Sequence, residues 1–399
     1  MGTLPTLPTL GSSDWFDWAS AVHAQLGTDL GRAGCLTVAS SSAPAGTKLL
    51  ADYVCDGVND QVQINAALAK ASRSGDGFGG QGFGRVLLVG PDFSIADDNA
   101  TCITMYPNTM LEGNGRATLL RPKWATNVDR GCIELYDADT THVRVSNLSI
   151  GRETAVTFNG HGIKFVQQGS GSSYTIKTGN DPYLQVDNVW VMFAGKKGIW
   201  CTGSSGGSRE SIIRDCLAWN CVEECIYLDN SSDSQVIGCR ASGGSGGYAG
   251  IRLGGGNTMV TACKVYYSEN PADGFLIDSS RCMISHCSAQ DNGRHGFSFT
   301  GGDVVASNLI ADSNSRLVTN GAGFNIAANG VYDGLEALDR GQTPASPQLT
   351  QFAFSGSPTV MLTGRSSLGS GGVNHVTGTP GGNSYVRIVR QGTSVYAVG

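Results

Sequence analysis

Charge is scarce in this 399-residue sequence, because Asp, Glu, Lys and Arg together make up only 15% of it. The formal net charge is −6, so the small excess is acidic. No basic stretch is available to neutralise phosphates, and we therefore expect no nucleic acid among the partners. The sequence also lacks the run of about 18 apolar residues that a membrane-spanning helix needs. We expect no membrane span.

Export signals and metal-binding motifs are missing as well. The first residues, MGTLPTLPTLGSSDWFDW, contain neither a charged region nor an apolar region of the secretory kind, so we expect synthesis in the cytoplasm without a signal peptide. Zinc sites favour C-x2-C pairs, and the nearest approach is Cys221 and Cys225, four residues apart. We expect no metal and no cofactor, and we interpret the 12 cysteines as small apolar residues of the core.

Glycine, in contrast, is abundant. The chain has 57 glycines, about twice the usual share, and 40% of its residues are hydrophobic. Many Ser, Thr and Asn residues accompany the glycines. A large core combined with many tight turns and little charge favours an all-β protein.

A regular spacing of four cysteines gives the first sign of a repeat. Cys216, Cys239, Cys263 and Cys287 each follow a short β-rich run, and they are 23, 24 and 24 residues apart. Apolar residues take the same place in neighbouring segments: Leu148 in VSNLSI, Val189 in VDNVWV and Leu309 in ASNLIA.

A second series interleaves with the cysteines. It consists of an apolar residue that follows Gly, or Cys in one case, at Ile163, Ile199, Ile226, Ile251, Phe275, Phe297 and Phe324. A sustained period of roughly 22–27 residues is the mark of stacked structural repeats. Helical spacing and leucine-rich signatures are both absent, which leaves a right-handed parallel β-helix. Equivalent residues of successive coils would then lie about 4.8 Å apart, and the cysteines would form a packing ladder inside it.

Asparagines close several of the same segments. They are Asn220, Asn270, Asn292 and Asn314. Because Asn tolerates the left-handed backbone conformation and bonds locally, we expect these residues to stack at a turn as an amide ladder.

Three stretches near the start resemble a known family. DGVNDQVQINAALAKA (56–71), GRVLLVGPDFSI (84–95) and NTMLEGNGRATLLRP (108–122) are similar to the opening of pectate-lyase-like β-helix proteins. The resemblance covers roughly 50–330 and implies a capping helix ahead of the first coils. The family includes polysaccharide lyases, glycoside hydrolases, epimerases and bacteriophage tailspikes.

The flanking segments resemble those of phage tailspikes. We expect an N-terminal virion-attachment segment (1–45), the β-helix (46–335) and a C-terminal β module for trimerisation (336–399). This likeness implies a homotrimer in the virion tail that binds a host cell-surface polysaccharide as its receptor. It also implies that the N-terminus contacts other tail or baseplate proteins.

A polysaccharide depolymerase of this kind would need paired carboxylates on the outer surface, one as general acid and one as base or nucleophile. Asp229 and Asp278 each come three residues after an apolar anchor, Ile226 and Phe275. They would share one column two coils apart, a separation of about 9.6 Å by strand spacing. This separation is at the upper edge of the roughly 6.5–9.5 Å of inverting glycosidases. Further candidate carboxylates in the adjoining turns are Glu223, Glu269 and Asp273.

Side chains for stacking on sugars and for charge contacts occur near that column. The candidates are Trp200, Trp219, Tyr227, Tyr248, Tyr267, Arg294 and His295. A polysaccharide lyase would need a basic residue beside carboxylates, and AGKKG supplies Lys196 and Lys197, but we expect no acidic cluster to face them. Glycosidase is therefore the first enzymatic interpretation and lyase the second. A binding or structural fibre without chemistry remains the alternative to both.

Overall fold

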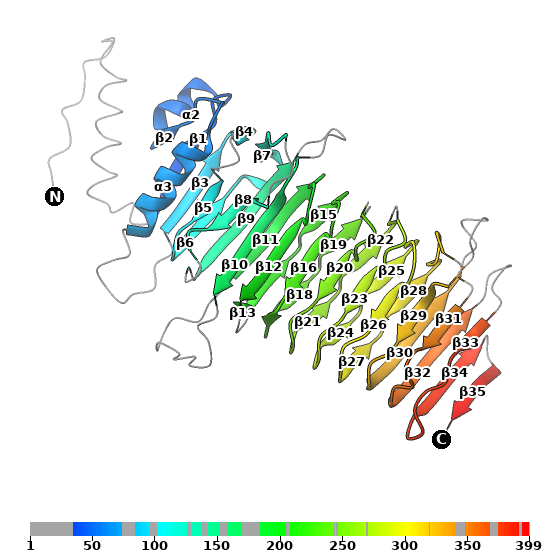
Figure 1. The fold of residues 1–399 in the computed structure, drawn as a ribbon. Coiled ribbons are helices and arrows are strands. Elements are labelled where there is room, and N and C mark those ends of the chain that lie inside the picture. The colour runs from blue at the N-terminus through cyan, green and yellow to red at the C-terminus, as the bar shows by residue number, and fades with distance from the viewer. Residues whose placement is uncertain are drawn as a thin grey trace, which may run out of the picture.

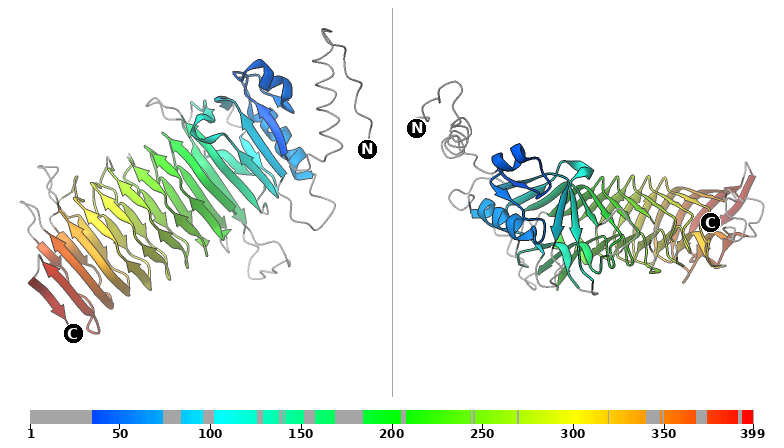
Figure 2. Two further views of the ribbon diagram at one scale, coloured as in Figure 1. Left: turned by 180° about the vertical axis from the view of Figure 1, so that it is seen from behind. Right: turned by 90° about the horizontal axis from the view of Figure 1, so that it is seen from above.

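The structure, a computed structural model, describes residues 35–73, 84–95, 102–125, 129–151 without 138, 139 and 141, 158–168, 184–204, 208–339 without 243, 245, 269 and 319, and 348–398 without 349, 368–373 and 391–392. These residues form an elongated stack of coils with helices at its N-terminal end (Figure 1). The other views show the same single stack (Figure 2).

A typical coil contains three short strands. In one coil they are β14 (Ser211–Arg214), β15 (Leu217–Trp219) and β16 (Ile226–Asp229). Each pairs in parallel with its counterpart in the next coil: β18 (Gln235–Ile237), β19 (Arg240–Ser242) and β20 (Ile251–Leu253). The predicted all-β parallel β-helix is confirmed.

The strands fall into two large parallel sheets. Sheet 1 holds the first and second strands, and sheet 2 holds the third strands. The remaining first strands are β1 (Cys35–Ala39), β3 (Gly84–Val89), β6 (Thr109–Glu112), β21 (Met259–Thr261), β24 (Met283–Ser285) and β27 (Val304–Ser307). The second strands include β4 (Asp92–Ile95), β7 (Leu119–Pro122), β22 (Lys264–Tyr266), β25 (Ser288–Gln290) and β28 (Ile310–Asp312). Five longer strands run through both positions: β9 (Val143–Gly151), β11 (Leu184–Met192), β30 (Gly330–Leu338), β32 (Val360–Ser367) and β34 (Tyr385–Arg390).

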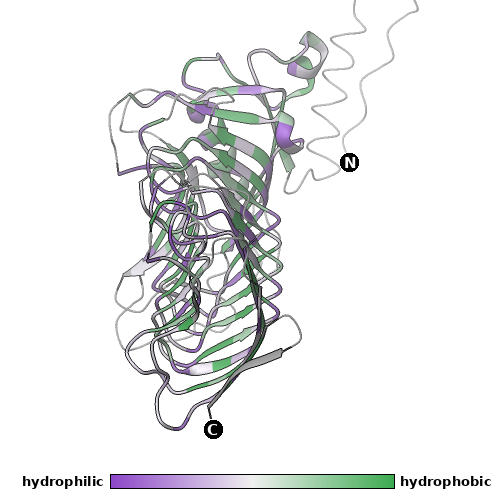
Figure 3. Ribbon diagram, turned by 90° about the vertical axis from the view of Figure 1, so that its right-hand side faces the viewer, coloured by the Kyte–Doolittle hydropathy of each residue, from purple (hydrophilic) through white to green (hydrophobic). Residues whose placement is uncertain are grey.

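Sheet 2 contains β16 and β20 together with β5 (Ile103–Met105), β8 (Gly131–Leu135), β10 (His161–Gln168), β12 (Ile199–Ser204), β23 (Phe275–Ile277), β26 (Phe297–Phe299), β29 (Ala322–Ile326), β31 (Thr350–Phe354) and β33 (Asn374–Thr377). The shorter elements are β2 (Tyr53–Val54), which pairs with β1, and β13 (Ser208–Arg209), which pairs with β17 (Ser231–Ser232). Apolar residues of the strands line the interior along the stack (Figure 3).

A left-handed residue makes the bend between the first and second strands in eight successive coils. These residues have φ between 48° and 65°, and they are Asn147, Asn188, Asp215, Gly238, Ala262, His286, Asn308 and Gly334. Asn, Asp and Gly adopt this conformation at little cost, which explains why they dominate the set. Each is followed at once by a buried residue: Leu148, Val189, Cys216, Cys239, Cys263, Cys287, Leu309 and Leu335. The phase of the cysteines is therefore set by the bend.

The predicted cysteine ladder is confirmed. All four of its thiols are buried, and the backbone N–H of Cys239 donates to Sγ of Cys263 at 3.3 Å. The N–H of Cys263 donates to Sγ of Cys287 at 3.4 Å. Burial raises the pKa of the Cys239 thiol well above its ordinary value, which makes it a poor nucleophile. The ladder contributes packing.

The apolar anchors of the second series also stack as predicted. The register pairs each anchor with the next, from Ile163 through Ile251 to Phe324. The aromatic part of this column is parallel-stacked, with 4.8 Å between the ring centroids of Phe275 and Phe297 and 5.2 Å between those of Phe297 and Phe324. Such ring pairs add about 0.5–1.5 kcal/mol each beyond the area they bury.

The predicted amide ladder is confirmed for two of its four members. Asn292 and Asn314 are buried, and Nδ2 of Asn292 donates to Oδ1 of Asn314 at 2.9 Å. Gln348 extends the ladder by accepting the backbone N–H of Asn314 at 2.9 Å. Asn220 instead occupies the left-handed position just before this column, with φ of 52°, and Asn270 is half-buried in a bend. For these two the prediction is wrong: Asn220 aligns with Tyr267, Asp291 and Ser313, one residue before the stacked amides, and Ser268 occupies the ladder position in the coil of Asn270.

Helix α3 (Gln61–Arg73) lies over the N-terminal end of the coils, as the resemblance implied (Figure 1). It buries Ile64, Ala67, Leu68 and Ala71 against the first strands. A shorter helix, α2 (Ala45–Leu50), and a 3₁₀ turn, η1 (Gly115–Ala117), complete the helical elements of the described chain. None of the described helices is long and apolar enough to cross a membrane.

The strands beyond residue 336 continue both sheets. The predicted boundary between 335 and 336 falls inside β30, and β32 and β34 extend sheet 1 while β31 and β33 extend sheet 2. The last strand, β35 (Thr393–Val398), pairs antiparallel with β34. Residues 1–34 lie outside the described residues, so the attachment segment stays a prediction.

The cysteine ladder yields a stability test. Replacing Cys263 by Ser places a hydroxyl in the apolar stack and should lower the free energy of unfolding by about 1–3 kcal/mol, measured by denaturant titration. Thiol labelling of the native protein should leave the four ladder cysteines unreacted. Cys35, which is only half-buried, serves as the positive control. Rapid native labelling of all four ladder thiols would contradict the interior assignment.

Candidate functional site

The outward face of sheet 2 carries four of the twelve predicted site residues: Asp229, Asp278, Trp200 and Tyr227. One outward column contains Lys164, Trp200, Tyr227 and Arg252, each paired with the next by the strand register. Because side chains alternate along a strand, the next outward column lies two residues further on. That column contains Thr202, Asp229, Gly254 and Asp278.

Asp229 and Asp278 therefore occupy one column two coils apart, as predicted. Leu228, Leu253 and Ile277 pair in sequence, so the residues that follow them, Asp229, Gly254 and Asp278, share the column. Gly254 has no side chain, and the Tyr227 hydroxyl lies against it: a Cβ at Gly254 would be 3.2 Å from that oxygen. The Tyr227 hydroxyl thus lies in the interval between the two carboxylates.

Asp229 is held by neutral donors. The Tyr227 hydroxyl donates to Oδ1 at 3.0 Å and the Thr202 hydroxyl to Oδ2 at 3.2 Å. Burial raises the pKa of Tyr227, so this side chain remains a hydroxyl donor. Asp278 has a charged partner instead: Nε and Nη2 of Arg252 donate to its Oδ2 at 3.0 and 2.7 Å. The two carboxylates differ in electrostatic environment.

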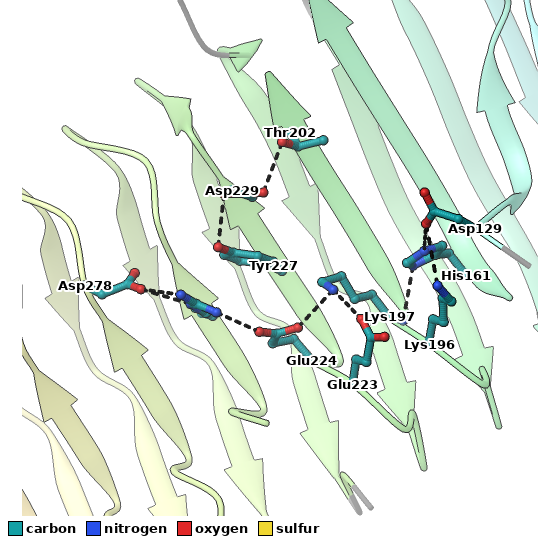
Figure 4. Close-up of polar contacts among 11 residues, drawn as sticks. Asp129, His161, Lys196, Lys197, Thr202, Glu223, Glu224, Tyr227, Asp229 and Asp278 are labelled. Atoms are coloured by element: carbon teal, nitrogen blue, oxygen red, sulfur yellow. Dashed lines mark hydrogen bonds and ion pairs between the residues drawn. The ribbon is translucent and has the colours of Figure 1, made fainter. Parts of the chain in front are cut away.

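Charged side chains link the coils into a continuous strip (Figure 4). We call Asp278, Arg252, Glu224, Lys197 and Glu223 the charged strip. Nη1 of Arg252 donates to Oε1 of Glu224 at 3.0 Å, and Nζ of Lys197 is 3.4 Å from Oε2 of Glu224. Lys197 also bonds Glu223. Glu224 is buried, and two cations flank it, which offsets the desolvation of its charge.

A second group of charges adjoins the strip around Asp129. Lys164 donates to its Oδ2 at 3.0 Å, and Nζ of Lys196 is 3.7 Å from Oδ1. We expected no acidic cluster to face the two lysines of AGKKG, but the paired carboxylates Glu223 and Glu224 face Lys197, and the single carboxylate Asp129 faces Lys196. Sequence distance conceals these pairs, since Lys197 and the two glutamates lie one coil apart and Asp129 and Lys196 lie two coils apart.

His161 is buried beside Asp129 and is held as a neutral ring. Its Nδ1 accepts the backbone N–H of Lys197 at 3.2 Å, so its proton is on Nε2, which donates to Asp129 Oδ1 at 3.0 Å. Burial lowers the pKa of His161 to about 4. Although partial burial opposes it, hydrogen bonds from Lys164 and His161 lower the pKa of Asp129 to about 2.

The aromatic candidates divide into two groups. The faces of Trp200 and Tyr227 are covered by cations: Nζ of Lys197 is 5.0 Å from the Trp200 ring, and the Arg252 guanidinium is 4.7 Å from the Tyr227 ring. Trp219, Tyr248 and Tyr267 are 41–49% exposed; Trp219 is the last residue of β15, and the two tyrosines lie in the turns between sheet 1 and sheet 2. Arg316 covers Tyr267 at 4.1 Å, and Trp219 lies against Phe193.

The remaining candidates lie in later turns that lead from sheet 1 into sheet 2. Asp273 is buried, and its carboxylate accepts two hydrogen bonds from Arg294, at 2.7 and 2.6 Å, and the backbone N–H of His295 at 3.1 Å. His295 Nδ1 accepts the backbone N–H of Ala322 at 3.0 Å. This arrangement ties adjacent turns together. Glu269 lies outside the described residues.

Sequence reasoning missed Arg252, Asp129, His161 and Thr202 as members of the site. Arg252 follows its anchor, Ile251, by one residue, as Tyr227 follows Ile226. Aligning the anchors would have placed Arg252 between the two candidate aspartates. Within the described part of the chain, no group of three or more His, Cys, Asp or Glu side chains is arranged to hold a metal ion.

The buried histidine predicts a pH dependence of stability. Because the folded-state pKa of His161 lies near 4 and that of an unfolded histidine near 6.5, the unfolded state binds the proton first. Stability should be full above pH 6.5 and fall by about 3 kcal/mol as the pH drops toward 4. The stability that comes from the lowered pKa of Asp129 is lost only at lower pH, between 3.8 and about 2.

Denaturant titrations at pH 7 and pH 4.5, with His161→Gln as the matched control, would measure this loss. The control should show a shallower decline between the two values. An imidazole resonance, assigned to His161 by its absence from the variant, that titrates near 6.5 would contradict the buried neutral ring.

Comparisons with known proteins identify the architecture. Residues 197–335 match the family model of the right-handed β-helix region. No curated protein matches the chain in sequence. The full-length tailspike protein 2 of an Escherichia coli O157:H7 bacteriophage matches over 83% of this chain and 44% of its own, with a TM-score of 0.65 and 15% identity. The enzymatically active domain of tailspike protein 2 from bacteriophage CBA120 matches over 83% of this chain and 49% of its own, with a TM-score of 0.64 and 15% identity.

A tailspike mutant of Escherichia coli bacteriophage HK620, in complex with a pentasaccharide, matches over 83% of this chain and 61% of its own, with a TM-score of 0.57 and 12% identity. The chain thus spans about half the length of the first two tailspike structures that it matches. At these identities the likeness concerns the fold. The chain is a right-handed parallel β-helix similar to those of phage tailspikes.

Proposed function

We propose that this protein is a bacteriophage tail protein that binds a host cell-surface polysaccharide and cleaves it by glycoside hydrolysis at the outward face of sheet 2. The observation that carries the proposal is the column that places Asp229 and Asp278 on either side of the Tyr227 hydroxyl. The likeness to tailspikes, one of them holding a pentasaccharide, supports the substrate class.

The surroundings of the two carboxylates assign their roles. The guanidinium of Arg252 donates two hydrogen bonds to Asp278, and a carboxylate held in this way suits a general base that activates water. Asp229 has only neutral hydroxyl partners, so it is the better general acid. Two strand spacings separate them by about 9.6 Å, which leaves room for a water molecule and favours inversion at the anomeric carbon.

Unpaired polar atoms point to a missing ligand at the same place. Trp200 Nε1 and Asp278 Oδ1 are buried without a hydrogen-bond partner in the described part of the chain. Buried polar groups are normally paired, so such atoms call for a partner. The hydroxyl groups of a sugar provide both donors and acceptors.

Hydrolysis fits the site better than a lyase reaction. A lyase base must give up its proton before it abstracts one, and Lys197 is the basic residue closest to the carboxylates of the strip. Although partial burial opposes it, the hydrogen bond to Glu223 and the charge of Glu224 raise the pKa of Lys197. A lysine held protonated in this way is unsuited to proton abstraction.

A receptor-binding fibre without chemistry is the second candidate. It is favoured by the ion pairing of the charged strip, because Glu223, Glu224 and Asp278 all have cationic partners. Such a strip ties neighbouring coils together whether or not a bond is cleaved. Under either function we propose a homotrimer in the virion tail, attached through the N-terminus to other tail or baseplate proteins.

Asp229→Asn and Asp278→Asn should each lower the rate of polysaccharide cleavage by at least about 10²-fold, the scale of losing a positioned proton-transfer group. Folding should persist, because Asn is isosteric and the partly exposed pair with Arg252 contributes at most about 1 kcal/mol. Reducing ends released from host surface polysaccharide would give the rate.

Asp303→Asn is the matched control, since Asp303 is exposed at a left-handed bend that Asn also adopts. This control should cleave at the wild-type rate, and all three variants should still bind the intact glycan. Wild-type cleavage rates in both site variants would show that Asp229 and Asp278 are not the catalytic residues. Binding by the wild type without any cleavage would favour the fibre.

A further inference from the structure

The first strands of sheet 1 carry a line of exposed apolar side chains. The strand register pairs each with the next, and they are Met259, Met283, Val305, Val331, Met361 and Tyr385. From Met283 onward their exposed fractions are 42–54%. We call these six residues the apolar column.

The fold itself does not require this column. The interior is filled by the alternate residues of the same strands, among them Ile284, Tyr332 and Leu362, which are buried. The apolar column contains no charge over six coils, whereas another outward column of sheet 1 contains Arg240, Lys264, Glu336 and Arg365. Contiguous exposed apolar surface on a soluble protein marks an interaction site.

We propose that the apolar column is the face through which copies of this chain associate, parallel and in register, in the homotrimer. Its six side chains repeat every 4.8 Å or so over a line of roughly 24 Å along the coil axis. A partner that matches the whole line must present side chains at the same repeat. Another copy of this chain does so, and cyclic symmetry brings equivalent residues together around one axis.

The neighbouring outward column favours close approach. It lies two residues further along the first strands and carries small hydroxyl side chains at Thr261, Ser285, Ser307 and Thr363, with Asp333 and Arg387 at the other two positions. These extend the contact beyond the apolar line, toward the roughly 800 Å² per partner of a standard interface. The arrangement also leaves the carboxylate pair of sheet 2 facing outward, on a different side of the coil.

The inference rests on the proposed homotrimer. The test distinguishes a wrong oligomeric state from a wrong contact face. The mass of the full chain is measured by light scattering for the wild type, for the double variant Met283→Glu/Met361→Glu and for Val166→Glu. Val166 is the matched control because it is an outward apolar residue, 37% exposed, on sheet 2. Circular dichroism checks the fold of each.

The wild type and the control should have three times the chain mass of 41.5 kDa, and the double variant should fall to 41.5 kDa. A monomeric wild type would overturn both the homotrimer and this face. A trimeric double variant would overturn the face and leave the homotrimer standing.

Cross-linking tests the orientation and does not depend on the charged variants. Met283→Cys should cross-link to itself in the native protein, and Val166→Cys should not. Mixing Met283→Cys chains with Tyr385→Cys chains should give no 283–385 product in a parallel assembly. Formation of that mixed product would show antiparallel packing, and no cross-link at all from Met283→Cys would contradict the proposed contact.

Discussion

In eight successive coils the chain turns from the first to the second strand at one left-handed residue and then places one small or branched side chain inside. This constraint organises the rest of the molecule. Once the bends at Asn188, Asp215, Gly238 and Ala262 are stacked, the parallel pairing fixes the register of every later residue in the coil. Residues some 25 positions apart in sequence then become neighbours about 4.8 Å apart. The carboxylate column, the charged strip and the apolar column all arise from this stacking.

The two outer faces of the coil have different compositions on the same scaffold. On sheet 2, charges alternate in sign from coil to coil, so that Arg252 contacts Glu224 in one direction and Asp278 in the other. On sheet 1, the apolar column excludes charge over six coils. A polar face suits recognition of a hydroxyl-rich glycan, and an apolar line suits contact with an identical neighbour. One chain can in this way combine a substrate face with an assembly face.

The interior was predictable from the sequence because inward positions repeat in kind. The Gly-apolar anchors and the cysteines keep their phase, and the structure stacks both series. Outward positions do not repeat, so their partners depend on side chains one coil away. That is why the pairs of Lys197 with Glu223 and Glu224, and the cations over Trp200 and Tyr227, were not anticipated. Asn220 was misplaced by one position because Asn occurs both at the left-handed position, where Asn220 lies, and at the ladder position that follows it, where Asn292 and Asn314 lie.

The stereochemistry of the first product tests the proposed carboxylate pair most directly. Nuclear magnetic resonance of freshly cleaved host surface polysaccharide shows whether the new anomeric carbon has inverted or retained its configuration. A separation of about 9.6 Å between Asp229 and Asp278, two strand spacings, predicts inversion. Retention, which requires carboxyl groups only about 5–5.5 Å apart, would contradict this pair, as would an unsaturated product formed by elimination.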